Sequence, residues 1–227
     1  MTMYSFKPNV DQVQEFIEIA GDFSNPLDLV REAISNSVDA KAKSLSILFD
    51  VIKEYGENVL LIVLRDDGIG MDQTTIQSFF DLGNSSNRDN PEAIGEKGHG
   101  TKVYFNSSEV EVVTVCNGMR IRAKMAEPYK KLFSRELPDV TVEEEAASGE
   151  PSGTTISIKG YNNNRREKFT HEILKDYIQW FSKLGSFETQ FKHTQHETFV
   201  VWLKGLNRKE QEALAFGHPF PYRKREY

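Results

Sequence analysis

The order in which helical and strand-like segments follow one another constrains the fold of this chain more than any other feature of its sequence. Apolar residues recur at helical spacing over residues 10–20 and 26–39, so two helices are expected near the start. Strand patterns follow at residues 45–51, 59–64, 109–115, 119–125, 153–159 and 198–203. Helices early and strands late predict an α+β fold, a two-layer sandwich with helices on one face of a mixed, mostly antiparallel sheet.

Turn signals and further helical patterns fill the intervals between these strands. Residues 55–58 are expected to close a first hairpin, and Asn117-Gly118 is a strong turn signal for a second. Helices are expected over residues 72–82 and 169–184.

Two polar stretches have no apolar period. Residues 83–92 predict a mobile loop. Residues 141–152 are rich in Glu, Ala, Ser and Gly and predict an exposed excursion outside the core.

Composition describes a globular protein with a packed core. The 227 residues are 38% hydrophobic and 27% charged, which fits one domain of ordinary size, alone or with an appended fragment. The formal charge of −6 does not indicate nucleic-acid binding, although a local basic patch would be compatible with it. The sequence shows neither a basic and apolar leader nor an apolar run of membrane-spanning length. We therefore expect a cytoplasmic protein without membrane association.

Four short segments carry chemistry, and the first lies in the expected second helix. Glu32 and Asn36 are four residues apart, so both side chains project from one helix face and can meet one ligand. A carboxylate and a carboxamide there can hold a metal ion and a water molecule. Taken alone, a solvated Glu32 and a capping Asn36 are the simpler interpretation.

The second segment, residues 66–71, has the sequence Asp-Asp-Gly-Ile-Gly-Met and follows directly on an apolar strand. Its glycines let the backbone approach a flat ligand closely, and a carboxylate at a strand end can accept a hydrogen bond from an exocyclic amine. Adenine carries such an amine. Taken alone, Asp-Asp-Gly is first of all an ordinary turn.

The third and fourth segments contain glycine and threonine. Residues 94–102 (Ile-Gly-Glu-Lys-Gly-His-Gly-Thr-Lys) offer unobstructed backbone N–H groups, two lysines and an expected helix start near Thr101, as a phosphate-binding loop does. Their spacing fits neither a Walker-type P-loop nor a dinucleotide fingerprint, and a flexible loop is the alternative. Residues 153–155 (Gly-Thr-Thr) open a strand and could place a hydroxyl beside the carboxylate of the second segment.

In this order, the four segments resemble the N box, the two glycine boxes and the closing Gly-Thr motif of the GHKL superfamily (gyrase, heat-shock-ninety chaperone, histidine kinase, MutL). The resemblance implies a Bergerat-type sandwich that holds ATP or ADP with Mg²⁺ between helices and sheet, under a lid at about residues 83–100. It implies Glu32 as the general base, Asn36 as the magnesium ligand and Asp66 as the residue that binds the adenine amine. The other implied nucleotide contacts are Gly68, Gly70, Met71, Gly95, Lys97, Gly98, His99, Gly100, Thr101, Lys102 and Thr154.

Two details select a branch within the superfamily. Histidine kinases usually carry Asn or His at the position of Glu32 and lack the Asp-Ala found here at residues 39–40, so hydrolysis is favoured over phosphotransfer. The lysine after Gly-His-Gly-Thr resembles MORC-type and related bacterial ATPases more than gyrase or MutL. The expected division is an ATP-binding domain over residues 1–165 and a C-terminal helix and strand over residues 166–227, which could begin a further domain.

The resemblance implies Mg²⁺-dependent ATP binding and slow hydrolysis that drive a conformational change or homodimerisation. Hydrolysis is expected to be weak in isolation, because members of the hydrolytic branch use a lysine from a second domain. Two alternatives stay open, a non-catalytic nucleotide sensor and a kinase acting on histidine or on another protein.

Overall fold

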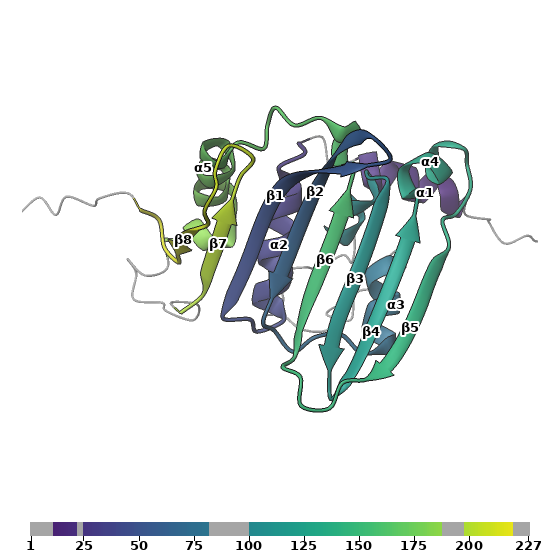
Figure 1. The fold of residues 1–227 in the computed structure, drawn as a ribbon, viewed down its shortest axis with the longest axis horizontal. Coiled ribbons are helices and arrows are strands. Elements are labelled where there is room, and N and C mark those ends of the chain that lie inside the picture. Colours follow the sequence, from purple (N-terminus) through teal and green to yellow (C-terminus); the bar gives the residue numbers. More distant parts are fainter. Residues whose placement is uncertain (1–10, 22–24, 82–99, 188–197, 220–227) are drawn as a thin grey trace, which may run out of the picture.

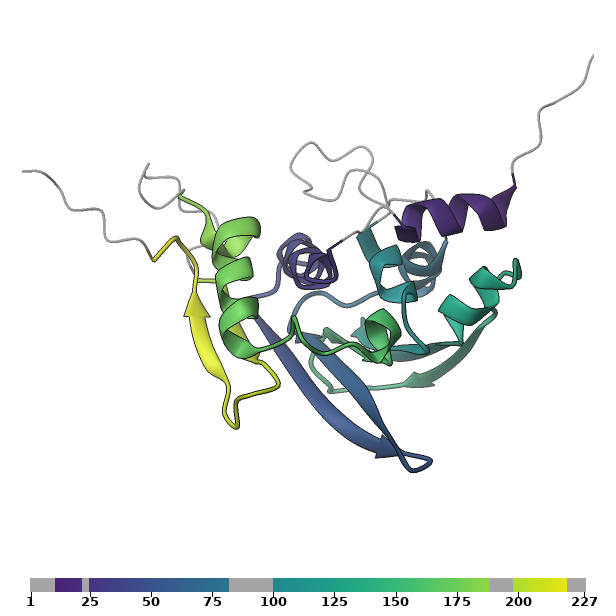
Figure 2. The same cartoon turned by 90° about the horizontal axis from the view of Figure 1, so that it is seen from above.

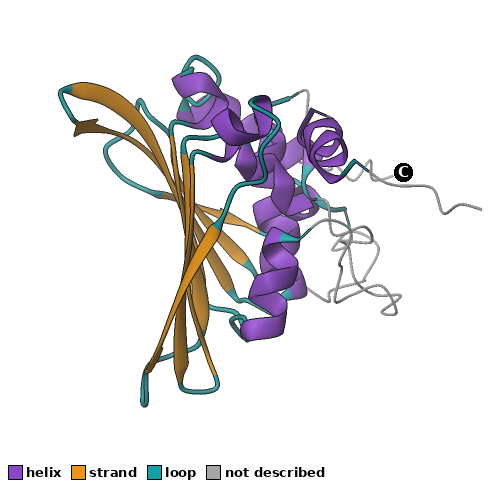
Figure 3. Ribbon diagram, turned by 90° about the vertical axis from the view of Figure 1, so that its right-hand side faces the viewer, coloured by secondary structure: helices purple, strands orange, loops and turns teal. Residues whose placement is uncertain are grey.

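The protein, seen here in a computed structural model, forms two layers. The structure describes residues 11–21, 25–81, 100–187 and 198–219. One layer is an eight-stranded sheet, and the helices form the other layer on one of its faces (Figure 3). The expected α+β sandwich is confirmed.

The sheet runs in the order β5-β4-β3-β6-β2-β1-β7-β8 (Figure 1). Neighbouring strands are antiparallel except β1 and β7, which are parallel, so the expected mixed, mostly antiparallel sheet is also confirmed. The strands are β1 (Ser44–Glu54), β2 (Glu57–Asp66), β3 (Glu109–Cys116), β4 (Met119–Ala126), β5 (Val140–Ala146), β6 (Gly153–Lys159), β7 (Val200–Lys204) and β8 (Glu212–Ala215).

The helical layer contains α-helices and short 3-10 turns. The α-helices are α1 (Gln12–Gly21), α2 (Asp28–Asp39), α3 (Gln73–Phe80), α4 (Pro128–Phe133) and α5 (His171–Phe181). The 3-10 turns are η1 (Gly100–Phe105), η2 (Tyr161–Asn164) and η3 (Lys183–Gly185). Figure 2 shows α2 in the middle of this layer, with α5 on one side and α1 on the other. None of the helices described here is long and apolar enough to cross a membrane.

The core lies between the two layers because each element buries one face. On β1 the alternating residues Leu45, Ile47 and Phe49 are buried, and on α2 Leu29 and Ile34 are fully buried. The continuation beyond residue 165 uses the same core: Phe169 stacks on Phe49 with ring centroids 5.0 Å apart, and β7 extends the sheet from β1.

Several described segments differ from the sequence prediction, and α4, where no helix was expected, is one of them. Residues 141–152 are largely exposed, as expected, but their first half is not an excursion from the sheet, because β5 pairs with β4 along its length. Most β5 side chains are exposed, as on an edge strand, so the segment has no alternating pattern to detect. The short strand β8 was not predicted at all. The helix expected near Thr101 is the 3-10 turn η1, which starts at Gly100.

Candidate functional site

Two adjacent aspartates at the end of β2 have different surroundings. Asp67 accepts hydrogen bonds from the amides of Lys43 (2.7 Å) and Ser44 (2.8 Å) and from the Ser44 hydroxyl (2.9 Å). Burial works against the charge of Asp67, but the hydrogen bonds from Ser44 and Lys43 outweigh it and lower the pKa. Asp67 therefore holds the start of β1 in place. Its three hydrogen bonds to Lys43 and Ser44 mark it as a structural residue, which leaves Asp66 as the candidate for ligand binding.

Asp66 is a carboxylate held in a poorly solvated position. Its Oδ1 accepts a hydrogen bond from the amide of Gly68 at 2.9 Å, and in the β2–β6 pairing it lies opposite Thr154. Burial raises the pKa of Asp66 to about 6, although hydrogen bonds from the backbone of Gly68 and Thr154 lower it. Ionisable side chains whose pKa is shifted this far by burial are concentrated at functional sites, so Asp66 is a candidate site residue.

Thr114 of β3 adds a hydroxyl that the sequence analysis missed. Its Oγ1 accepts a hydrogen bond from the amide of Met71 (2.8 Å) and lies 3.1 Å from both the Gly153 carbonyl and the Thr154 hydroxyl. Thr114 and Thr154 are both buried. The sequence did contain a signal for this residue, because the threonine falls at the same alternate positions of β3 as the buried valines. The two hydroxyls join the Gly-Thr segment to the loop that follows Asp66.

The glycines of that loop leave no room for side chains. A Cβ atom at Gly68 would lie 2.7 Å from the carbonyl oxygen of Ala40. Gly70 has φ +74°, and a Cβ atom there would lie 2.0 Å from the carbonyl oxygen of Val115. The loop therefore packs tightly between the C-terminus of α2 and β3, and glycine is required at both positions.

Helix α2 brings Glu32 and Asn36 to the same region. The amide of Ile69 donates to the carbonyl of Ala40 at 3.0 Å, so the C-terminus of α2 contacts the loop after Asp66. The buried Tyr104 of η1 has its pKa raised by burial and then by the charge of Glu32, with a smaller effect from Asp66. A hydrogen bond from the Asn36 side chain lowers the pKa of the same hydroxyl, so three predicted site residues affect the pKa of Tyr104.

Tyr104 was not predicted as a site residue. The side-chain oxygen is buried and makes no hydrogen bond of standard geometry within the described residues, although the Asn36 amide lies close enough to lower its pKa. A buried hydroxyl in this state is normally satisfied by a ligand or an ordered water molecule.

Glu32 is partly buried and faces the start of η1. Burial raises the pKa of Glu32, against the opposing effect of the Arg31 guanidinium. A Cβ atom at Gly100 would lie only 2.2 Å from Glu32 Oε2, so the absence of a side chain at Gly100 leaves space for this carboxylate oxygen.

Lys102 and Thr101 are directed into the helical layer. The Lys102 ammonium donates to the carbonyl of Phe79 (2.7 Å) and to the Thr101 hydroxyl (2.9 Å), which itself donates to the Phe79 carbonyl (2.8 Å). Burial lowers the pKa of Lys102 to about 7. In this structure the Lys102 side chain links η1 to α3 through its hydrogen bond to the Phe79 carbonyl. The contact of Lys102 with phosphate stays a prediction. Other predicted contacts lie outside the described residues: Gly95, Lys97, Gly98 and His99.

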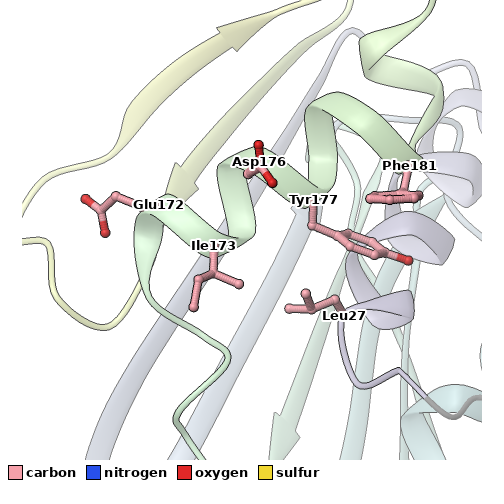
Figure 4. Close-up of a pocket in the computed structure, with 6 residues that line it drawn as sticks. All are labelled: Leu27, Glu172, Ile173, Asp176, Tyr177 and Phe181. Atoms are coloured by element: carbon pink, nitrogen blue, oxygen red, sulfur yellow. The ribbon is translucent and has the colours of Figure 1, made fainter.

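One surface hollow in the described part of the chain lies away from these residues. A groove of about 440 Å³ runs between α5 and the start of α2, and none of the predicted site residues lines it. Figure 4 shows Ile173, Tyr177 and Phe181 of α5 along this groove, with Leu27 opposite.

Comparisons with known proteins agree with this geometry at the level of family. The model of the family described as "Histidine kinase-, DNA gyrase B-, and HSP90-like ATPase" matches residues 26–147, a span that contains Glu32, Asn36 and Asp66. The DNA mismatch repair protein MutL of Christiangramia forsetii is 27% identical over 211 residues, which are 88% of this chain and 32% of that protein. The chain thus spans about a third of the length of this curated relative.

Both findings fall within the GHKL superfamily, whereas the MORC-like branch stays a prediction. ATP binding and a nucleotide-dependent function are what this family relationship supports in general terms. The family model covers more than half of the chain, and the sheet and helices have the expected arrangement. This chain therefore belongs to the family of histidine kinase-, DNA gyrase B- and HSP90-like ATPases.

Proposed function

We propose that this chain binds ATP together with Mg²⁺ and hydrolyses it slowly, and that nucleotide binding drives a conformational change or homodimerisation. The observation that carries the proposal is Asp66, a carboxylate with a raised pKa at the end of β2, followed by a loop whose glycines let it pack closely against α2 and β3.

The adenine end of the nucleotide would lie at Asp66. An ionised carboxylate accepts hydrogen bonds only, so Asp66 is suited to an exocyclic amine. Thr154, supported by Thr114, would help to orient that carboxylate. The loop that contains Gly68, Gly70 and Met71 would contact the base and ribose.

The phosphate end would lie toward α2 and η1. Asn36 offers an amide oxygen to magnesium, which when bound neutralises phosphate charge and polarises the terminal phosphoryl group. Glu32 would orient the attacking water through Oε2, the oxygen that faces Gly100. The raised pKa of Glu32 favours this role, because a general base works best with a pKa nearer to the operating pH.

The glycine-rich segment would surround the phosphates. Backbone N–H groups around Gly95, Gly98 and Gly100 would donate to phosphate oxygens. Four side chains would add to this contact: Lys97, His99, Thr101 and Lys102. Ordering of this segment by nucleotide would create the surface on which a second copy assembles.

Magnesium-dependent phosphate release by the wild type and by Glu32→Gln tests the proposal. The wild type should release phosphate slowly, and the variant should bind ATP with similar affinity while releasing phosphate at least about a hundredfold more slowly, as loss of a central catalytic group does. Glu18→Gln, a substitution on α1, is the matched control and should behave like the wild type. ATP binding without turnover in the wild type would instead favour the sensor, and transfer of phosphate to protein would favour the kinase.

A further inference from the structure

A chain of polar contacts joins α5 to Glu32. The Tyr177 hydroxyl donates a hydrogen bond to Asp28 Oδ1 at the start of α2. The same oxygen pairs with Arg31 Nη1 at 3.0 Å. Arg31 in turn donates to Glu32 Oε1 through Nη2 (3.2 Å) and Nε (3.3 Å). The side chains of Tyr177, Asp28 and Arg31 thus connect α5 with the proposed general base.

Arg31 needs a second partner to hold its guanidinium against Glu32. Residues that are adjacent on a helix do not face each other, so the guanidinium must fold sideways to contact the Glu32 carboxylate. Asp28, one turn earlier, accepts the other edge of the guanidinium and holds it in this position. With Oε1 engaged by Arg31, Oε2 remains directed at Gly100.

The Tyr177 side chain is held in place by burial and by packing against a second aromatic ring. Only 6% of its surface is exposed, and its ring stacks on Phe181 with centroids 5.1 Å apart. Figure 4 shows the Tyr177 side chain extending from α5 toward α2. The helix α5 lies outside residues 26–147, the span matched by the family model, so this contact comes from a part of the chain that the family comparison does not cover.

We propose that Tyr177 is a positioning residue: its hydroxyl fixes Asp28, Asp28 fixes Arg31, and Arg31 holds Glu32 Oε1 so that Oε2 faces the start of η1. The catalytic consequence rests on the proposed function of Glu32 as general base. The structural consequence, a fixed Glu32 carboxylate, does not.

The geometry sets the size of the expected effect. The Arg31 side chain is 39% exposed, so solvent screens its ion pairs, and such pairs contribute modestly. Loss of Arg31 from Glu32 should therefore change the proton affinity of Glu32 and the turnover rate by about two- to fivefold, rather than abolish activity.

The first experiment measures the proton affinity of Glu32 in nucleotide-free protein by NMR of carboxyl-labelled glutamate, with the resonance assigned through Glu32→Gln. The groups that act on Glu32 are Arg31 and Asp28 on α2, Tyr177 on α5 and Tyr104 on η1. Tyr177→Phe removes one hydroxyl and no charge. It should raise the proton affinity of Glu32 about two- to fivefold, because Arg31 is no longer held against it.

Tyr161→Phe is the matched control, since it removes a buried hydroxyl that donates to the Pro26 carbonyl rather than to Asp28. Unchanged proton affinity of Glu32 in Tyr177→Phe, or an equal rise in Tyr161→Phe, overturns the proposal. If Tyr177→Phe does not fold, Arg31→Lys decides: it keeps the charge but lacks the planar fork that bridges Asp28 and Glu32, and it should raise the proton affinity as well.

The second experiment measures steady-state ATP hydrolysis. Tyr177→Phe should lower kcat about two- to fivefold and change KM for ATP by less than about twofold, because the adenine site is untouched. Wild-type kcat in an active preparation of Tyr177→Phe overturns the positioning role. If the wild type itself has no turnover, the proposed function fails, while the NMR result still decides whether Tyr177 positions Glu32.

Discussion

Replacing Asp66 with asparagine should make the nucleotide-free protein more stable at neutral pH. Burial raises the pKa of Asp66 from 3.8 to about 6, which means that the folded protein binds a proton at this site more tightly than the unfolded chain does. The carboxylate is therefore a source of instability whenever it is ionised. Its contribution to stability is most favourable below pH 3.8 and is lost as the pH rises through about 6.

The magnitude follows from the difference between the two pKa values. A difference of about two pH units, at about 1.4 kcal/mol for each, gives an upper limit of about 3 kcal/mol at pH 7.5. The neutral amide oxygen of asparagine accepts weaker hydrogen bonds from the Gly68 and Thr154 amides than a carboxylate does, which costs about 1 kcal/mol. The net gain expected for Asp66→Asn is about 1–2 kcal/mol, or a rise in Tm of roughly 2–8 °C.

Urea unfolding of wild type and Asp66→Asn at pH 7.5 and at pH 5.0 measures this gain. The variant should be more stable at pH 7.5, and the difference should shrink at pH 5.0, where Asp66 is largely protonated in the folded wild type. A variant that is less stable at pH 7.5, or a difference independent of pH, would refute the reasoning.

Three further substitutions have outcomes set by the structure. Gly100→Ala should reduce phosphate release about tenfold or more with little loss of stability, because its methyl group would displace the Glu32 carboxylate, and an unchanged rate would contradict this contact. Gly70→Ala should destabilise the fold by more than about 3 kcal/mol in urea, because of its positive φ and the nearby carbonyl of β3, whereas Gly56→Ala, at a positive φ with open space around it, should cost less. Glu212 has a pKa lowered to about 2 by hydrogen bonds from its lysine and histidine partners, so its stabilisation is present above pH 4.5 and lost as the pH falls toward 2. Glu212→Gln should therefore cost about 1–2 kcal/mol at pH 6.5 and almost nothing near pH 2, as acid titration of the Tm would show.

Much of the architecture was predictable because buried elements leave periodic patterns. The alternation at Leu45, Ile47 and Phe49 is the buried face of β1, and the expected strands before residue 165 are present as β1, β2, β3, β4 and β6. The pattern failed at β5, whose side chains face solvent on most positions, and at β8, which is only four residues long.

The site could be predicted as a set of segments but not as a set of contacts. Sequence alone does not show that Asp67 accepts hydrogen bonds from the backbone at the start of β1, because the donors come from residues more than twenty positions away. It also does not show that Lys102 is buried, or that Thr114 and Thr154 share a hydrogen bond across β3 and β6. These contacts depend on strand register, which only the folded chain specifies.

Calorimetric titration of MgATP into the wild type and Asp66→Asn tests the central claim most directly, with Asp50→Asn, an exposed aspartate on β1, as the control. The wild type and Asp50→Asn should bind with the same affinity and one nucleotide per chain. Asp66→Asn should bind about ten- to a hundredfold more weakly, since a hydrogen bond to a charged group contributes about 1.5–3 kcal/mol. Equal affinity of wild type and Asp66→Asn would contradict the assignment of Asp66 as the residue that binds adenine.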